Sequence, residues 1–138
     1  MKDNYFRFKT RIQYGYTLIE LLITLSIMGI ILGAAVISYG QYLISANRQD
    51  AVSLLSTTVL RLERCFTLEG TYNGACTLRA ISEDGLYTLE AARQAQSYTL
   101  SAVPVAAGRQ AKDSDCATLT ISSTGDKTAT GPKGRNCW

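Results

Sequence analysis

The 138-residue chain contains no histidine, only two prolines, and no charged side chain between Glu20 and Arg48. Without histidine the Ser-His-Asp catalytic triad cannot form, and a common zinc ligand is missing. No pair of its four cysteines has CxxC spacing, which argues further against a zinc site. These absences argue against the usual catalytic triad and against a zinc site, and we expect no enzymatic activity, no metal and no cofactor.

The uncharged stretch extends from Leu21 to Asn47 and consists mostly of Leu, Ile, Ala, Gly and Val. About 20 apolar helical residues span the roughly 30 Å of hydrocarbon in a bilayer. The stretch is therefore long enough to cross a membrane. A cleaved secretory signal, the alternative, has a shorter apolar region of about 7–15 residues followed by a small-residue cleavage site.

The positive charge of the chain is concentrated at its N-terminus. Residues 1–15 carry four basic side chains and one acidic side chain, whereas the remaining 123 residues hold ten of each. Basic residues that flank an apolar span stay on the cytoplasmic side, which predicts a cytoplasmic N-terminus and an exported C-terminus. A nucleic-acid-binding protein carries its positive charge on the folded surface. Nucleic acid is therefore not an expected partner, although the C-terminal part has a modest basic patch of Lys112, Lys127, Lys133 and Arg135.

After the uncharged stretch, the apolar side chains recur every three or four positions, as on one face of an amphipathic helix. The stripe comprises Ala51, Leu55, Thr58, Leu62 and Cys65, and Arg48, Arg61 and Arg64 lie mostly off it. Gly70 is a helix stop signal. We therefore predict one helix over residues 16–69, about 80 Å long. Its first half lies in lipid and its second half packs on a soluble domain.

The part after the helix shows turn and strand patterns. Residues 70–85 are rich in loop residues, and four short segments with strand composition follow, at 86–89, 97–103, 116–121 and 127–130. We predict an α+β fold in which an antiparallel meander packs one face on the helix and turns the other towards solvent. Asp113, Asp115 and Asp126 are expected to be solvated loop carboxylates rather than calcium ligands.

The segment Gly15-Tyr16-Thr17-Leu18-Ile19-Glu20-Leu21-Leu22 joins the basic leader to the apolar helix. It resembles the processing site of type IV prepilins, in which a membrane peptidase cuts after the glycine and N-methylates the new first residue. The resemblance implies cleavage after Gly15 and methylation of Tyr16, where most members have phenylalanine. It also implies the type IV pilin fold, with a leader (1–15), a transmembrane and filament-core half-helix (16–47), and a periplasmic globular domain (48–138).

Glu20 is the unusual residue of the apolar helix, because an ionisable group inside a membrane is costly unless it is paired. In the pilin family this glutamate meets the N-terminal ammonium of a neighbouring subunit, which implies a role for Glu20 in filament assembly. The alternative is an interfacial glutamate that reaches headgroup water. Gly29 and Gly33 form a GxxxG pattern. Such a pattern permits close helix packing, but glycine is also simply common in membrane helices.

The four cysteines, Cys65, Cys76, Cys116 and Cys137, all follow the predicted span. They are therefore expected in an oxidising compartment, where four cysteines allow three pairings. Residues 61–66, residues 98–100 and the terminal Asn136-Cys137-Trp138 resemble PilE-type minor pilins. That resemblance implies a Cys116–Cys137 disulfide that closes the C-terminal loop, and a Cys65–Cys76 disulfide at the end of the helix.

The resemblance as a whole implies a structural subunit of a type IV pilus. We expect a minor pilin that helps to initiate or cap the filament and supports pilus biogenesis, adhesion and twitching motility. The expected partners are other pilins, the prepilin peptidase, the inner-membrane assembly platform and, before assembly, membrane lipid. The expected location is the inner membrane, crossed once, and then the extracellular pilus. The alternatives are the major pilin, a DNA-uptake receptor pilin and a type II secretion pseudopilin, which the four exported cysteines and the Cys-Trp end fit poorly.

Overall fold

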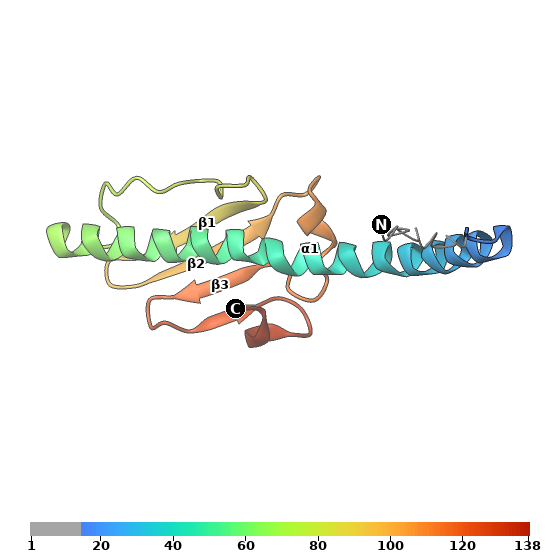
Figure 1. Ribbon diagram of the computed structural model, residues 1–138. Coiled ribbons are helices and arrows are strands. Elements are labelled where there is room, and N and C mark those ends of the chain that lie inside the picture. Colours follow the sequence, from blue (N-terminus) through green and yellow to red (C-terminus); the bar gives the residue numbers. More distant parts are fainter. Residues whose placement is uncertain (1–14) are drawn as a thin grey trace, which may run out of the picture. The chain divides into compact units, whose positions relative to one another are not determined.

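The computed structural model describes residues 15–138, so the expected leader, apart from Gly15, lies outside the described residues (Figure 1). The elements in chain order are α1 (Leu18–Glu69), β1 (Tyr87–Arg93), β2 (Tyr98–Pro104), the 3₁₀ helix η1 (Arg109–Lys112), β3 (Leu119–Ser122), β4 (Lys127–Ala129) and the 3₁₀ helix η2 (Gly134–Cys137). The described chain divides between Ser38 and Tyr39 into two units, which are considered separately.

Both ends of α1 follow from local chemistry. At the start, the backbone N–H of Glu20 donates to Oγ1 of Thr17 at 3.3 Å, so Thr17 caps the helix. At the end, Gly70 adopts a positive φ of 67°, and its N–H donates to the carbonyl of Phe66 at 2.8 Å. A residue without Cβ takes this left-handed conformation at little cost, so the predicted stop at Gly70 is confirmed.

The described part of the N-terminal unit includes the first part of α1, and its large apolar side chains from Leu18 to Val36 are exposed. Within residues 15–138, α1 is the helix that is long and apolar enough to span a membrane, and none of its most apolar 18-residue window is buried. The mean hydropathy of that window is 2.5. An apolar surface of this length fits a lipid environment.

The C-terminal unit holds a four-stranded antiparallel meander in the order β1-β2-β3-β4, as expected. Two strand boundaries differ from the prediction by more than one residue. β1 continues to Arg93 because residues 90–93 pair with β2 as far as Tyr98. The sequence pattern missed this part of the strand, because residues 90–92 are all exposed and show no alternation of buried and exposed side chains. β3 begins only at Leu119 because Ala117 and Thr118 bond to Thr130 instead of to β2.

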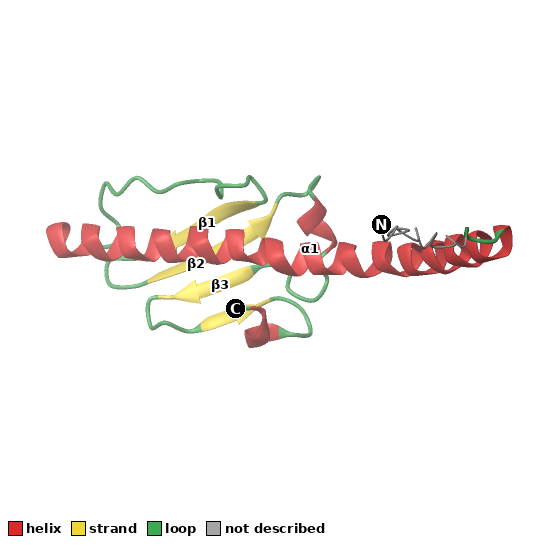
Figure 2. Cartoon of the chain, viewed as in Figure 1, coloured by secondary structure: helices red, strands yellow, loops and turns green. Residues whose placement is uncertain are grey.

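The core lies between α1 and one face of this sheet (Figure 2). The helix contributes the predicted stripe, since Ala51, Leu55, Thr58 and Leu62 are all buried. From the sheet, alternate residues of β2 and β3 meet it, namely Tyr98, Leu100, Ala102, Leu119 and Ile121. The buried hydroxyl of Thr58 donates to the carbonyl of Leu54 within the helix at 2.7 Å, so this polar group costs little inside the core.

Candidate functional site

The first candidate region is the N-terminal end of α1. Tyr16 and Glu20 line one surface cleft of about 340 Å³, together with Leu21 and Thr24. Tyr16 is 88% exposed, and a Cβ added to Gly15 would meet no other atom within 4 Å. The structure therefore places the expected new N-terminus and the acidic side chain at the same end of the helix, with open space around Gly15. The Thr17 cap was missed from the sequence, although the Thr-x-x-Glu signal is visible there.

Gly29 and Gly33 lie one turn apart on α1, away from this cleft. A Cβ built on either glycine would meet no atom of the chain within 4 Å. Nothing within the described chain therefore requires glycine at these positions. A steric requirement for glycine here would come from another helix.

At the other end of α1, the Cys65–Cys76 disulfide ties the helix to the loop that follows, with Cα atoms 6.1 Å apart. The ring of Tyr72 stacks on Phe66, with ring centroids 4.4 Å apart. The hydroxyls of Tyr72 and Tyr98 both donate to the carboxylate of Glu63, at 3.0 Å in the shorter contacts. Burial, and then these bonds to Glu63, raise the pKa of both tyrosines. Sequence reasoning missed Glu63, because its partners are 9 and 35 residues away.

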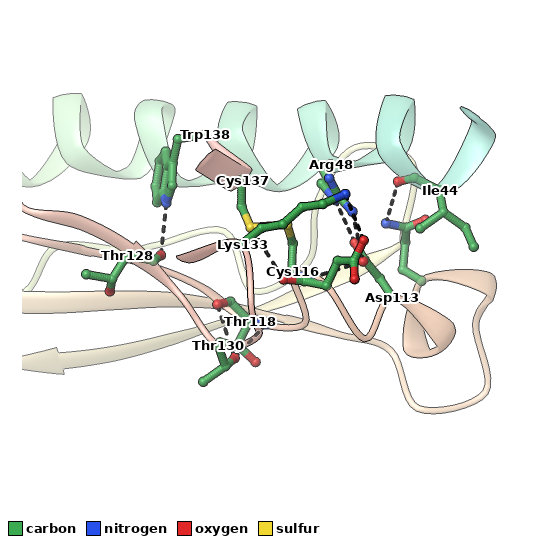
Figure 3. Close-up of a disulfide and its surroundings, with 12 residues drawn as sticks. Ile44, Arg48, Asp113, Cys116, Thr118, Thr128, Thr130, Lys133, Cys137 and Trp138 are labelled. Carbon is green, nitrogen blue, oxygen red and sulfur yellow. Dashed lines mark hydrogen bonds and ion pairs between the residues drawn. A yellow bond between two sulfur atoms is a disulfide. The ribbon is translucent and has the colours of Figure 1, made fainter. Parts of the chain in front are cut away.

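The second disulfide, Cys116–Cys137, closes the C-terminal loop, with Cα atoms 5.7 Å apart (Figure 3). Both pairs are those that the family resemblance implied. Next to it, Nε1 of Trp138 donates to the carbonyl of Thr128 in β4 at 2.9 Å. Lys127 lies over the indole, 4.9 Å from its centroid. The C-terminal segment thus covers part of the last strand, whose backbone groups would otherwise be open to pairing.

A buried ion pair fastens the loop after η1 to the helix. The guanidinium of Arg48 donates to the two carboxylate oxygens of Asp113 at 2.7 and 2.9 Å (Figure 3). The exposed fractions of the two side chains are 11% and 2%. Burial opposes ionisation of Asp113, but the hydrogen bonds and charge of Arg48 outweigh it, so the pKa of Asp113 is lowered. The same carboxylate accepts the N–H of Cys116 at 3.1 Å.

This pair corrects two expectations. Arg48 is not off the buried face, and Asp113 is not a solvated loop carboxylate, because the two residues, 65 positions apart, neutralise each other. The other two loop carboxylates also face cations. Asp115 pairs with Lys133 at 2.8 Å, and Asp126 lies 4.0 Å from Arg135. Among residues 15–138 there is no group of three His, Cys, Asp or Glu side chains arranged to hold a metal ion.

Gln110 fixes η1 itself to the same part of the helix. Its fully buried side chain donates to the carbonyl of Ile44 at 3.1 Å and to the hydroxyl of Tyr87 at 2.7 Å. With the Arg48–Asp113 pair, it holds residues 110–113 against residues 44–48 of α1. No pattern in the sequence indicated this contact.

Comparison with known proteins gives two family matches. The family described as "Type IV minor pilin ComP, DNA uptake sequence receptor" matches residues 38–120, which is more than half of the chain. The family described as "Prokaryotic N-terminal methylation motif" matches residues 10–36. The two matches lie side by side and together cover the helix and most of the C-terminal unit.

A solved structure shares the fold. The chain is similar to the crystal structure of the Neisseria meningitidis non-core minor pilin PilV, with a TM-score of 0.55 and 16% identity. The similarity covers 66% of this chain and 90% of that chain. The likeness supports the arrangement of a long N-terminal helix packed on an antiparallel sheet. No curated protein sequence matches the chain significantly.

Proposed function

Since the chain belongs to the type IV minor pilin family that matches residues 38–120, we propose that it is built into a type IV pilus as a minor subunit. That family match is the observation that carries the proposal. The N-terminal methylation motif over residues 10–36 and the pilin fold support it. In this function the chain is a building block without catalysis, and it is itself the substrate of a processing enzyme.

The proposed route begins in the inner membrane. The basic leader (1–15) stays in the cytoplasm, residues 16–47 cross the bilayer, and residues 48–138 face the periplasm. A prepilin peptidase cuts after Gly15 and methylates Tyr16. The open position of Gly15 and the exposure of Tyr16 support access by that enzyme. The assembly platform and other pilins then receive the mature subunit.

We assign filament docking to Glu20. Cleavage creates an ammonium group at Tyr16, at the cleft that Glu20 also lines. In an apolar filament core each of these charges needs a partner of opposite sign, and a neighbouring subunit can supply it. The pair would therefore favour the register in which the ammonium of one chain meets the carboxylate of the next.

The test is direct. The gene is deleted in its natural host, complemented with the wild-type chain, and the sheared filaments are analysed by quantitative mass spectrometry. We expect mature chain beginning at methylated Tyr16, at a small fraction of the major subunit. Chain found only in the membrane fraction would contradict incorporation, and abundance equal to that of the main subunit would indicate the major pilin instead.

A second candidate function is DNA reception, because the matching family is described as a DNA uptake sequence receptor. Exposed Lys127, which lies over the half-buried Trp138, offers a cation beside an aromatic ring, and Lys133 and Arg135 are also exposed. Against it, Lys133 is paired with Asp115, and residues 16–138 have no net charge. Binding to duplex DNA is measured over a series of salt concentrations, with Lys127→Gln/Arg135→Gln as the variant. A receptor requires affinity that falls steeply with salt, and a shallower slope in the variant.

A further inference from the structure

Two basic side chains of η1, Arg109 and Lys112, are exposed on the surface of the C-terminal unit. Among residues 15–138, the ion pairs use Arg48, Lys133 and Arg135, and neither cation of η1 takes part in one. Their charges are therefore free to meet an anionic partner.

The structure fixes where η1 lies along α1. The side chain of Gln110, in the middle of η1, donates to the carbonyl of Ile44 at 3.1 Å. Lys112 lines a cleft of about 120 Å³ together with Gln41 and Ile44. Because Asp113 follows η1 directly and is bound to Arg48, η1 has little freedom to move away from this part of the helix.

Residue counting along α1 predicts the membrane surface at this level. The uncharged stretch begins at Leu21, and about 20 residues cross the hydrocarbon, so the hydrocarbon ends near Gly40. Tyr39 and Tyr42, 62% and 69% exposed, lie at that point. Tyrosine is enriched where hydrocarbon meets headgroups. Ile44 is four residues further on, about 6 Å along the helix. The headgroup layer on each side is about 5–7 Å thick.

We propose that Arg109 and Lys112 bind the phosphate groups of anionic phospholipids while the subunit waits in the membrane. The inference rests on the proposed function, because it requires that residues 16–47 are inserted in the bilayer. Each basic residue near an anionic membrane surface favours the bound state about fivefold, so the two together favour it about thirtyfold. The contact would press one side of the globular domain against the membrane and would be released on extraction into the filament.

The experiment uses the full chain in lipid nanodiscs that contain a dansyl-labelled lipid. The sequence has one tryptophan, Trp138, so energy transfer from Trp138 to the dansyl headgroup reports how close the globular domain lies to the membrane. Discs of phosphatidylcholine alone are compared with discs of an equimolar mixture of phosphatidylcholine and phosphatidylglycerol. Size-exclusion chromatography first confirms insertion, and failure at that stage counts against the proposed function rather than against this inference.

We expect stronger transfer in the anionic discs, and we expect Arg109→Gln/Lys112→Gln to abolish the difference. Arg109→Lys/Lys112→Arg should retain it, which separates charge from folding. The matched control is Arg61→Gln/Arg64→Gln, which removes the same charge from exposed positions about 25–30 Å farther along α1. This control should keep the difference. Equal energy transfer from the wild type in both kinds of disc would overturn the proposal, and so would an equal loss of the difference in the matched control. Loss of duplex DNA binding in the η1 variant, with energy transfer unchanged, would also overturn it.

Discussion

The buried pair between Arg48 and Asp113 makes the stability of the C-terminal unit depend strongly on one carboxylate. Asp113→Asn keeps the shape of the side chain but leaves the guanidinium of Arg48, 11% exposed, without its counter-ion. Removing one partner of a buried pair typically costs about 3–5 kcal/mol. An exposed pair contributes at most about 1 kcal/mol. We therefore expect Asp113→Asn to lower the free energy of unfolding by about 3 kcal/mol or more.

The assay is guanidinium chloride unfolding of a fragment of residues 39–138 with both disulfides formed. The matched control is Lys133→Gln, which breaks the pair with Asp115, whose side chains are 52% and 41% exposed. The control should cost less than about 1 kcal/mol. If Asp113→Asn lowers the free energy of unfolding no more than the control does, the buried pair does not stabilise the fold more than an exposed pair, and our reasoning is wrong.

The pair also sets the direction of a pH effect. The pKa of Asp113 is lowered in the folded unit because Arg48 outweighs the cost of burial. A carboxyl group of this kind contributes its stability above its unfolded pKa of about 3.9, and loses it as the pH falls through the lower folded pKa. The difference in unfolding free energy between wild type and Asp113→Asn should be constant above about pH 5 and shrink below about pH 4. A difference that does not shrink at all between pH 5 and pH 2 would contradict the assignment.

Three further outcomes are expected. Gly15→Val should leave an uncleaved precursor in the membrane, because the peptidase has to accept a residue without a side chain; a mature chain starting at Tyr16 in that variant, read by mass spectrometry, would refute this. Glu20→Gln should be processed and inserted normally but fall at least about a hundredfold in sheared filaments, since an unpaired charge costs about 3–5 kcal/mol; incorporation equal to wild type on immunoblots would identify Glu20 as an interfacial charge. Glu63→Gln should lower the pKa of Tyr98, which burial and then the bond to Glu63 raise, and an unchanged ultraviolet titration would show that burial alone sets it.

The N-terminal half of the molecule follows from local sequence. A helix in lipid satisfies its own backbone, so hydropathy, a run free of proline and the stop at Gly70 were enough to predict α1 within two residues at its start and at the correct end. The apolar stripe of Ala51, Leu55 and Leu62 likewise predicted the buried face, because helical periodicity is a property of neighbouring residues. The four strands and their order were also predicted, with errors only at boundaries that pairing decides.

Tertiary structure alone decided the polar contacts that position the loops. Arg48 appears as a surface residue in the helical pattern, and Asp113 as a loop carboxylate, yet each is buried because the other neutralises it. The same holds for Gln110 and Ile44, 66 residues apart, and for Glu63 and Tyr98, 35 apart. A hydrogen bond of this kind depends on where two distant segments meet, and no local pattern encodes that position. The burial of a charge is therefore settled by its partner, and the partner becomes known only when the chain is folded.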